Sequence, residues 1–226
     1  MSNGEKRYPY MLRFARHGFS RYIAHLDWIR IVQTALDRSG LPLIYTEGFA
    51  PKAKLKYSPP LPVGLASDCE LVLIFLSRNL KPEFVMETLH GSMPDGILIT
   101  GAHFMHPAPP KNPFQSINGA LYEMIFHDEP LDKKKILNAF DMKIEMSDEL
   151  MTQAKLIVKI VNRDEFIDRE NPLEYVAKLE EKQTFHPIKF SIALKNHLNL
   201  KHIPEGKKLA FLNIDEKGAR KLFQFD

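Results

Sequence analysis

Two ionisable residues, His25 and Asp27, stand at the start of residues 23–38, a segment with helical spacing of its apolar residues. A histidine there could act as a general acid or base at the edge of a basic groove. Because His25 falls in the apolar arc of the helix, it could equally be a core histidine bonded to a neighbouring loop. Asp27 lies about 160° from His25 around the helix, given the ~100° step per residue, so the two cannot share a proton. Asp27 is therefore interpreted as a first-turn carboxylate or as a partner of Arg30 or Arg21.

A second group of residues that could bind a ligand or react is a run of basic residues at the end of the first predicted strand and in the turn after it. Gly18 allows that turn to bend sharply. Helix N-termini favour anions, and arginine suits bidentate contact with phosphate. The alternative is a solvated surface turn. The residues of this predicted phosphate-binding turn are Arg13, Arg16, His17 and Arg21.

Three lysines, Lys52, Lys54 and Lys56, alternate along the next basic segment. An extended chain would direct all three to one side, where they could follow a phosphate backbone. Phe49 and Tyr57 lie nearby and could stack on a base. The alternative is a hairpin whose edge is protected by lysines.

Positive charge is concentrated at one end of the chain. Residues 1–57 carry ten Lys or Arg against four Asp or Glu, whereas the other 169 residues carry 21 against 24. A local excess of positive charge is typical of a surface that binds a polyanion, most often a nucleic acid. The sequence therefore indicates a nucleic-acid-binding surface in its first part.

Missing motifs exclude many enzyme classes. Cys69 is the only cysteine, so the chain alone can form no internal disulfide, four-cysteine zinc site or iron–sulfur cluster. No phosphate-binding loop, dinucleotide fingerprint, HExxH motif or GxSxG motif is present. The histidines are scattered, and His103 and His106 have no carboxylate triad nearby. We expect no cofactor and no metal site.

Neither a membrane span nor a signal peptide is expected. The longest wholly aliphatic or aromatic run, residues 71–76, is far shorter than the about 20 residues that a spanning helix needs. The N-terminal MSNGEKRYPY lacks an apolar stretch after its charges. With one cysteine and no oxidising-compartment signature, the expected location is the cytoplasm.

Four prolines within residues 106–118 predict an extended linker. We expect a basic domain over residues 1–105 and a second domain over residues 119–226. In the first, the patterns predict strands over 8–14, 41–46, 70–76 and 96–104, and helices over 23–38 and 81–93. The apolar stripe of the first helix comprises Leu26, Ile29, Val32 and Leu36.

The patterns of the second domain fit the same order of strands and helices as in the first. Its predicted strands are 120–127, 143–147, 154–161 and 187–194, with an extra strand over 208–214; its helices are 131–140 and 171–182. The order βαββαβ is that of the split βαβ unit. We therefore predict an α+β fold of two tandem ferredoxin-like domains joined by a Pro-rich linker.

Three stretches within residues 10–76 form a specific combination: RFARHGFSRYIAHLD (13–27), ALDRSGLPL (35–43) and EGFAPKAKLKYSPPLPVGLASDCE (47–70). In these stretches the chain resembles the radical-SAM-linked protein family of bacteria. Members occur as separate chains or fused to radical-SAM proteins, so the resemblance implies a radical-SAM enzyme as a partner. Because this chain has one cysteine, the three-cysteine cluster of such an enzyme would sit on the partner. The resemblance implies no catalytic residues.

Two functions follow as hypotheses, and the sequence leaves open which applies. The favoured one is a non-catalytic accessory module that holds RNA, or an RNA-linked substrate, for the radical-SAM enzyme through the basic residues above. The alternative is a metal-independent endoribonuclease, similar to CRISPR repeat-processing ribonucleases, with His25 as acid or base. An adaptor whose basic patch meets an acidic protein is a third interpretation.

Overall fold

A computed structural model describes residues 6–127, 131–132, 153–161, 166–167, 172–179 and 185–223. The fold is of the mixed α+β kind, with antiparallel strands and three α-helices in the described residues. It divides into two compact units, one ending at Gln115 and the other running from Ser116 to Phe223. This boundary falls within the Pro-rich segment 106–118.

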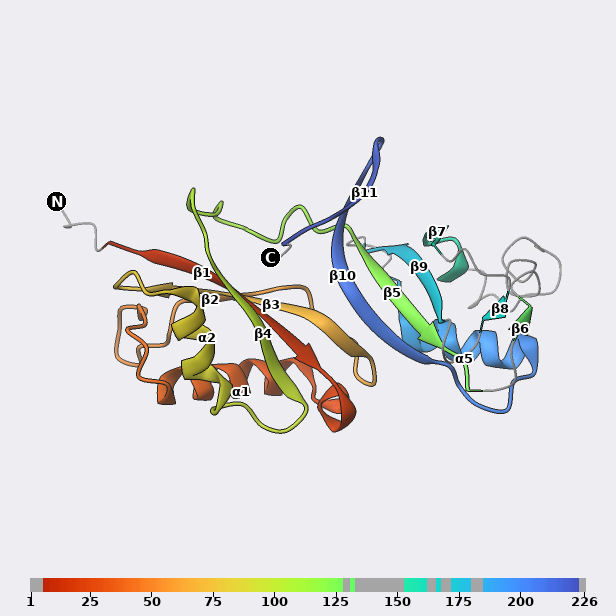
Figure 1. Ribbon diagram of the computed structural model, residues 1–226, viewed down its shortest axis with the longest axis horizontal. Helices are drawn as coiled ribbons and strands as arrows, with labels where there is room; N and C mark the ends of the chain where they lie inside the picture. Colours follow the sequence, from red (N-terminus) through yellow and green to blue (C-terminus); the bar gives the residue numbers. More distant parts are fainter. Residues whose placement is uncertain are drawn as a thin grey trace. The chain divides into compact units, whose positions relative to one another are not determined.

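The first unit is a four-stranded antiparallel sheet with two α-helices (Figure 1). Its elements are β1 (Tyr8–Arg16), a 3₁₀ helix η1 (Gly18–Tyr22), α1 (His25–Arg38), β2 (Leu55–Tyr57), β3 (Ala66–Leu76), α2 (Pro82–His90) and β4 (Ile97–Phe104). The strand order is β4-β1-β3-β2, and each neighbouring pair is antiparallel. The predicted strands and helices over residues 8–14, 70–76, 81–93 and 96–104 are confirmed within a few residues at their ends.

One face of this sheet and both helices enclose the core of the unit. Alternate residues of β1, namely Tyr10, Leu12 and Phe14, are fully buried in it, as period-two alternation requires. The buried residues of α1 are Trp28, Val32, Ala35 and Leu36. The predicted apolar stripe is confirmed at Val32 and Leu36. It is wrong at Leu26, which is 67% exposed, and Ile29 is only half-buried.

The predicted strand over residues 41–46 is not a strand. Gly40, at φ 70°, ends α1 as expected, and the chain then makes only isolated bridges at Leu43 and Tyr45. Pro42 donates no hydrogen bond, which limits the ladder that this segment can form. The second strand of the sheet is instead β2, within the lysine segment.

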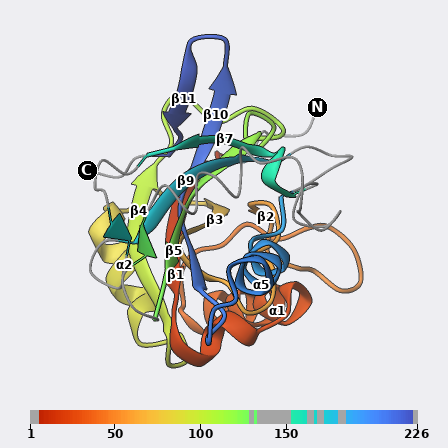
Figure 2. The ribbon, with the colours of Figure 1, turned by 90° about the vertical axis from the view of Figure 1, so that its right-hand side faces the viewer.

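The second unit also contains an antiparallel sheet. Its elements are β5 (Gly119–Ile125), β6 (Leu131–Asp132), β7 (Ile157–Ile160), β8 (Phe166–Ile167), β9 (Leu173–Lys178), α5 (Pro187–Leu198), β10 (Glu205–Asp215) and β11 (Gly218–Lys221). The order is β11-β10-β5-β9-β7, while β6 and β8 pair separately. Figure 2 shows the β10–β11 hairpin reaching beyond β5 and β9.

Two predicted elements of this unit are wrong. The segment predicted as helix 171–182 contains strand β9, and the segment predicted as strand 187–194 lies in helix α5. In α5, buried residues recur at positions 187, 190, 191 and 194, which is helical spacing. Strands β5, β7 and β10 confirm the predictions at 120–127, 154–161 and 208–214.

Residues 131–132 form a strand where a helix was predicted to begin. The rest of that predicted helix, and the predicted strand 143–147, lie outside the described residues. Across the described ranges, no helix combines the length and apolar character needed to cross a bilayer.

Candidate functional site

The turn after β1 is held firmly against β4. The backbone N–H of His17 donates to the carbonyl of Gly96 at 2.9 Å, and the Ser20 hydroxyl lies 2.8 Å from that same carbonyl. A Cβ on Gly96 would lie 2.6 Å from the His17 carbonyl oxygen, and its φ of +81° also favours glycine. Gly18 has a φ of 54°, which confirms the sharp bend predicted there. The basic turn is therefore a fixed structure.

Arg16 lies inside the protein, with a residue exposure of 1%. Its Nη2 donates to the carbonyls of Ser20 at 2.8 Å and Ile23 at 2.7 Å, and its guanidinium lies 5.3 Å from the centre of the Trp28 ring. Burial lowers the pKa of Arg16, and the charge of Glu70 partly opposes this. Arg16 therefore ties η1 to the start of α1 and does not present its charge to solvent.

Around Arg16 lies a group of polar side chains, here called the buried polar cluster: Arg16, Ser67 and Glu70, which are buried, and His25 and Tyr57, which are half-buried. Glu70 is 2% exposed and accepts a hydrogen bond from the Ser67 hydroxyl at 2.7 Å. The His25 and Tyr57 rings meet edge to face at 6.5 Å between centroids. The Nε and Nη1 atoms of Arg16 are buried without a hydrogen-bond partner.

The cluster influences the protonation of His25. Partial burial lowers the pKa of His25 below its ordinary 6.5, the charge of Glu70 raises it, and that of Arg16 lowers it. A neutral imidazole can accept a proton, which is the requirement for a general base. Burial also raises the pKa of Tyr57, so its phenol stays protonated.

Asp27 does not join the cluster. Its carboxylate accepts a hydrogen bond from Arg30 at 2.8 Å on the exposed side of α1, as one of the predicted alternatives states. Both side chains are more than half exposed, so this ion pair is a surface feature of the helix.

The other three residues of the predicted phosphate-binding turn, Arg13, His17 and Arg21, each contact different neighbours. Arg13 donates from Nε to the Thr100 hydroxyl at 3.1 Å, on the sheet face opposite the helices. His17 lies 2.9 Å from an Asp68 carboxylate oxygen, with a side-chain exposure of 41%. Arg21 lies 5.1 Å from the Tyr22 ring centre. The turn therefore does not gather its four basic side chains into a single solvent-facing group.

The lysine segment keeps its cations on one side. Ala53, Leu55 and Tyr57 pack against the core of the first unit. Since successive side chains of an extended segment point to opposite sides, Lys52, Lys54 and Lys56 face away from that core. Lys52 is exposed, and the Lys56 ammonium donates to the carbonyl of Lys111. Among the described residues, neither Lys52 nor Lys54 has a side-chain hydrogen bond or ion pair.

A short hairpin carries these lysines at the edge of the sheet. The N–H of Thr46 donates to the Lys52 carbonyl at 2.8 Å, and the N–H of Lys54 donates to the Ile44 carbonyl at 2.8 Å. Phe49 lies in the connecting loop and is fully exposed. We call Phe49, Lys52, Lys54 and Lys56 the lysine hairpin.

Apolar side chains are also exposed at the start of α1. Phe19 is 91% exposed and Tyr22 is 56% exposed; three residues apart in a 3₁₀ helix, they share a face. Leu26 follows in the first turn of α1 at 67%. Exposed apolar residues that gather on one segment are typical of a protein-binding surface.

The sequence patterns assigned no site role to Ser67 or Glu70. Both residues lie in the stretch PLPVGLASDCE, residues 60–70, which follows the lysine segment. Tyr57 was predicted to stack on a base, and its ring packs against the core of the first unit. Among the described residues, no group of three or more His, Cys, Asp or Glu side chains is arranged to hold a metal ion. Cys69 is buried.

Comparison with protein-family models identifies a family that this chain matches. A family model described as an uncharacterized protein conserved in bacteria (DUF2344) matches residues 9–200. The matched range contains the buried polar cluster, the lysine hairpin and most of the second unit. No curated protein matches the chain.

Proposed function

This chain belongs to the bacterial family DUF2344, whose model covers residues 9–200, and we propose that it binds RNA, or an RNA-linked substrate, for a partner radical-SAM enzyme. It acts in this proposal as a non-catalytic accessory module in the cytoplasm. The observation that carries the proposal is the lysine hairpin.

The hairpin supports RNA binding through charge and shape. Lys52 and Lys54 lie at an edge of the sheet and face away from the core, in the region where the charge excess is concentrated. Phosphate neutralisation by such lysines supplies sequence-independent affinity. The exposed Phe49 adds a surface on which an unpaired base could stack. These features favour single-stranded RNA.

The partner enzyme is inferred from the resemblance of residues 10–76 to the radical-SAM-linked proteins. We propose that the enzyme contacts the exposed apolar side chains Phe19, Tyr22 and Leu26. Burying such side chains against a partner removes apolar surface from water, which favours association. The lysine hairpin is a different segment and stays available for RNA.

We further infer that both units are ferredoxin-like. In the first unit, β1, β2, β3 and β4 are arranged in the order 4-1-3-2. In the second unit, the corresponding first to fourth strands are β5, β7, β9 and β10. Their order in the sheet, β10-β5-β9-β7, is again 4-1-3-2. Antiparallel pairing throughout, and a helix between the third and fourth strands of each unit, support the inference.

Salt dependence tests the RNA-binding proposal. Three lysines that each neutralise one phosphate of a single strand give a slope of about −2 in log affinity against log salt. Affinity for an unstructured oligouridine should therefore fall roughly 40-fold between about 50 mM and about 300 mM salt. Equal binding at the two salt concentrations would remove the basis of the proposal.

A second candidate function, metal-independent RNA cleavage, rests on a specific observation: His25, with a lowered pKa, lies within electrostatic range of both Arg16 and Glu70. A neutral His25 could deprotonate a ribose 2′-hydroxyl. Incubating RNA with the full chain in the presence of a chelator tests this. Cleavage that is lost in His25→Ala supports it, and intact RNA after prolonged incubation dismisses it.

A further inference from the structure

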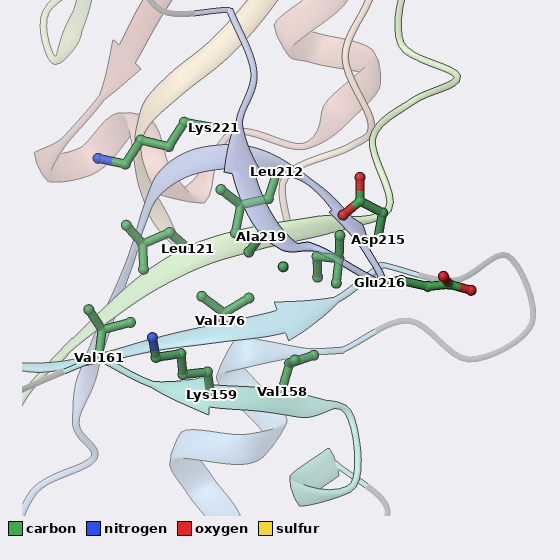
Figure 3. Close-up of a pocket in the computed structure, with 12 residues that line it drawn as sticks. Leu121, Val158, Lys159, Val161, Val176, Leu212, Asp215, Glu216, Ala219 and Lys221 are labelled. Carbon is green, nitrogen blue, oxygen red and sulfur yellow. The ribbon is translucent and has the colours of Figure 1, made fainter.

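The second unit contains a pocket of about 450 Å³. It lies on the face of the β5–β9–β10 sheet that carries Leu121, Val176 and Leu212 (Figure 3). Their neighbours along the strands, such as Tyr122 and Tyr175, point to the other face, where Tyr175 packs against Phe190 of α5. The pocket is therefore on the sheet face opposite α5.

Two backbone features give the pocket its walls. The register of β7 against β9 shifts between Ile157 and Lys159, and such a bulge redirects side chains, so that both Val158 and Lys159 line the pocket. On the other side, the β10–β11 hairpin contributes Ile214 and Ala219, which are partners in its register. Most of the lining residues belong to hydrogen-bonded strands, while Glu216 lies in the β10–β11 turn and Val161 follows β7.

The pocket differs in charge at its two ends. Figure 3 shows the ammonium ends of Lys159 and Lys221 toward one side, and the carboxylates of Asp215 and Glu216 toward the other. Within the described residues, the side chains of Lys159 and Lys221 make no hydrogen bond or ion pair. Asp215 is engaged by its own hairpin, since it accepts from the Lys217 N–H at 2.8 Å and pairs with Arg220.

We propose that this pocket binds an amphipathic anion, with its apolar body on Leu121, Val176 and Leu212 and its carboxylate or phosphate group toward Lys159 and Lys221. The volume lies within the range of about 300–1,000 Å³ that small-molecule sites occupy. An apolar floor contributes affinity by burial, while the two lysines select an anionic head group and set its direction. This proposal is independent of RNA binding by the first unit.

The test is an NMR titration of the full chain, labelled with ¹⁵N, with decanoate, decyl phosphate and decanol as separate probes. Binding in the pocket predicts saturable shifts of the amides of Val158, Val176, Leu212 and Ala219. One anionic probe, or both, should bind more tightly than decanol, and comparison of the two identifies the preferred head group. Shifts absent from these amides, or equal affinity for decanol and both anions, would overturn the proposal.

Two variants and one control test where the anionic head group and the apolar body of the ligand bind. Lys159→Glu/Lys221→Glu should weaken binding of the anions about tenfold, as expected for two partly screened ion pairs, and leave decanol binding nearly unchanged. Ala219→Trp, at an exposed position of β11, should fill the pocket and weaken all probes. Lys189→Glu/Lys195→Glu, on α5 at the opposite face, is the control with the same change in net charge. Unchanged anion binding in Lys159→Glu/Lys221→Glu and in Ala219→Trp would contradict the assignment.

Discussion

At the scale of single residues, the guanidinium of Arg16 is shielded from water and hydrogen-bonds to the backbone around it. Its Nη2 donates hydrogen bonds to the carbonyls of Ser20 and Ile23, between η1 and α1. Glu70 lies within electrostatic range and is itself 2% exposed. Burying two opposite charges is costly unless each is well paired, so removing one partner is strongly destabilising.

Replacement of Arg16 by methionine should therefore reduce stability while sparing RNA affinity. The free energy of unfolding should fall by about 2–4 kcal/mol, because two hydrogen bonds to a charged donor are lost and Glu70 loses a compensating charge. Urea denaturation measures this loss. Arg13→Met, at a partly exposed position, is the control and should cost less. Full stability of Arg16→Met together with lost RNA binding would instead make Arg16 a ligand contact.

His25 gives a pH dependence with a definite sign. Because its pKa in the folded protein is below the ordinary 6.5, the unfolded chain binds more protons between these two values. The stabilising contribution of neutral His25 is thus present above about pH 6.5 and is lost as the pH falls through the folded-state pKa. Denaturation midpoints measured from about pH 7.5 to about 5.5 should fall less steeply in His25→Gln. A folded-state pKa at or above 6.5, measured by NMR, would contradict this account.

At the scale of elements, the lysine hairpin shows what the sequence could and could not predict. Alternation predicts that Lys52, Lys54 and Lys56 lie on one side of an extended segment, and the packing of Ala53, Leu55 and Tyr57 confirms it. A hairpin was the alternative interpretation of this segment, but the second strand of the sheet was predicted over residues 41–46, because that apolar run has the stronger strand composition. Strand pairing depends on distant partners, here β3, which a local pattern does not contain.

The exchange of helix and strand in the second unit has a similar cause. The Asn-Pro pair at residues 171–172 is a common helix start and favoured a helix over residues 171–182. In the structure, Leu173, Tyr175 and Ala177 are buried at alternate positions of β9. Short apolar segments fit both periods, so tertiary packing decides between them. Alternation along β1 places Arg16 on the apolar face that carries Phe14, and Arg13 on the other face, but both were assigned to the basic turn because of their residue type.

Phe49 at the tip of the lysine hairpin provides a test of stacking. Its ring is fully exposed, so Phe49→Ala should leave the free energy of unfolding unchanged within about 0.5 kcal/mol. A lost base stack should weaken binding of single-stranded RNA by about 1–3 kcal/mol. Fluorescence anisotropy with an oligouridine measures this, and Phe84→Ala, exposed on α2, is the matched aromatic control. Equal affinities of the Phe49→Ala variant and the unaltered chain would exclude stacking at this position.

At the scale of the whole molecule, charge and apolar surface lie on different segments of the first unit. The sequence predicts two units and a basic first part, because composition and proline content are properties of long stretches. It does not predict which basic residues reach solvent, since that depends on the packing of β1, α1 and β3. The exposed Phe19, Tyr22 and Leu26 become recognisable as a surface only when the structure is known.

Affinity purification of the full chain from its host tests the proposed partnership. The chain should bring down a radical-SAM enzyme, and Phe19→Ser/Leu26→Ser should reduce the recovered enzyme at least about tenfold, because hot-spot apolar anchors each contribute about 1 kcal/mol or more. These exposed positions leave folding intact, which circular dichroism verifies. A variant on α2, Phe84→Ser, is the control. Recovery of no radical-SAM enzyme by the unaltered chain would argue against this partner.

The most direct test of RNA binding by the lysine hairpin compares two charge reversals with the same change in net charge. Lys52→Glu/Lys54→Glu alters the hairpin, and Arg78→Glu/Lys81→Glu alters exposed cations between β3 and α2. At about 50 mM salt, the hairpin variant should bind oligouridine at least about tenfold more weakly than the unaltered chain, with a salt slope reduced by about 1.4. The control should stay within about twofold. Equal weakening of both variants, or of neither, would contradict binding at the lysine hairpin.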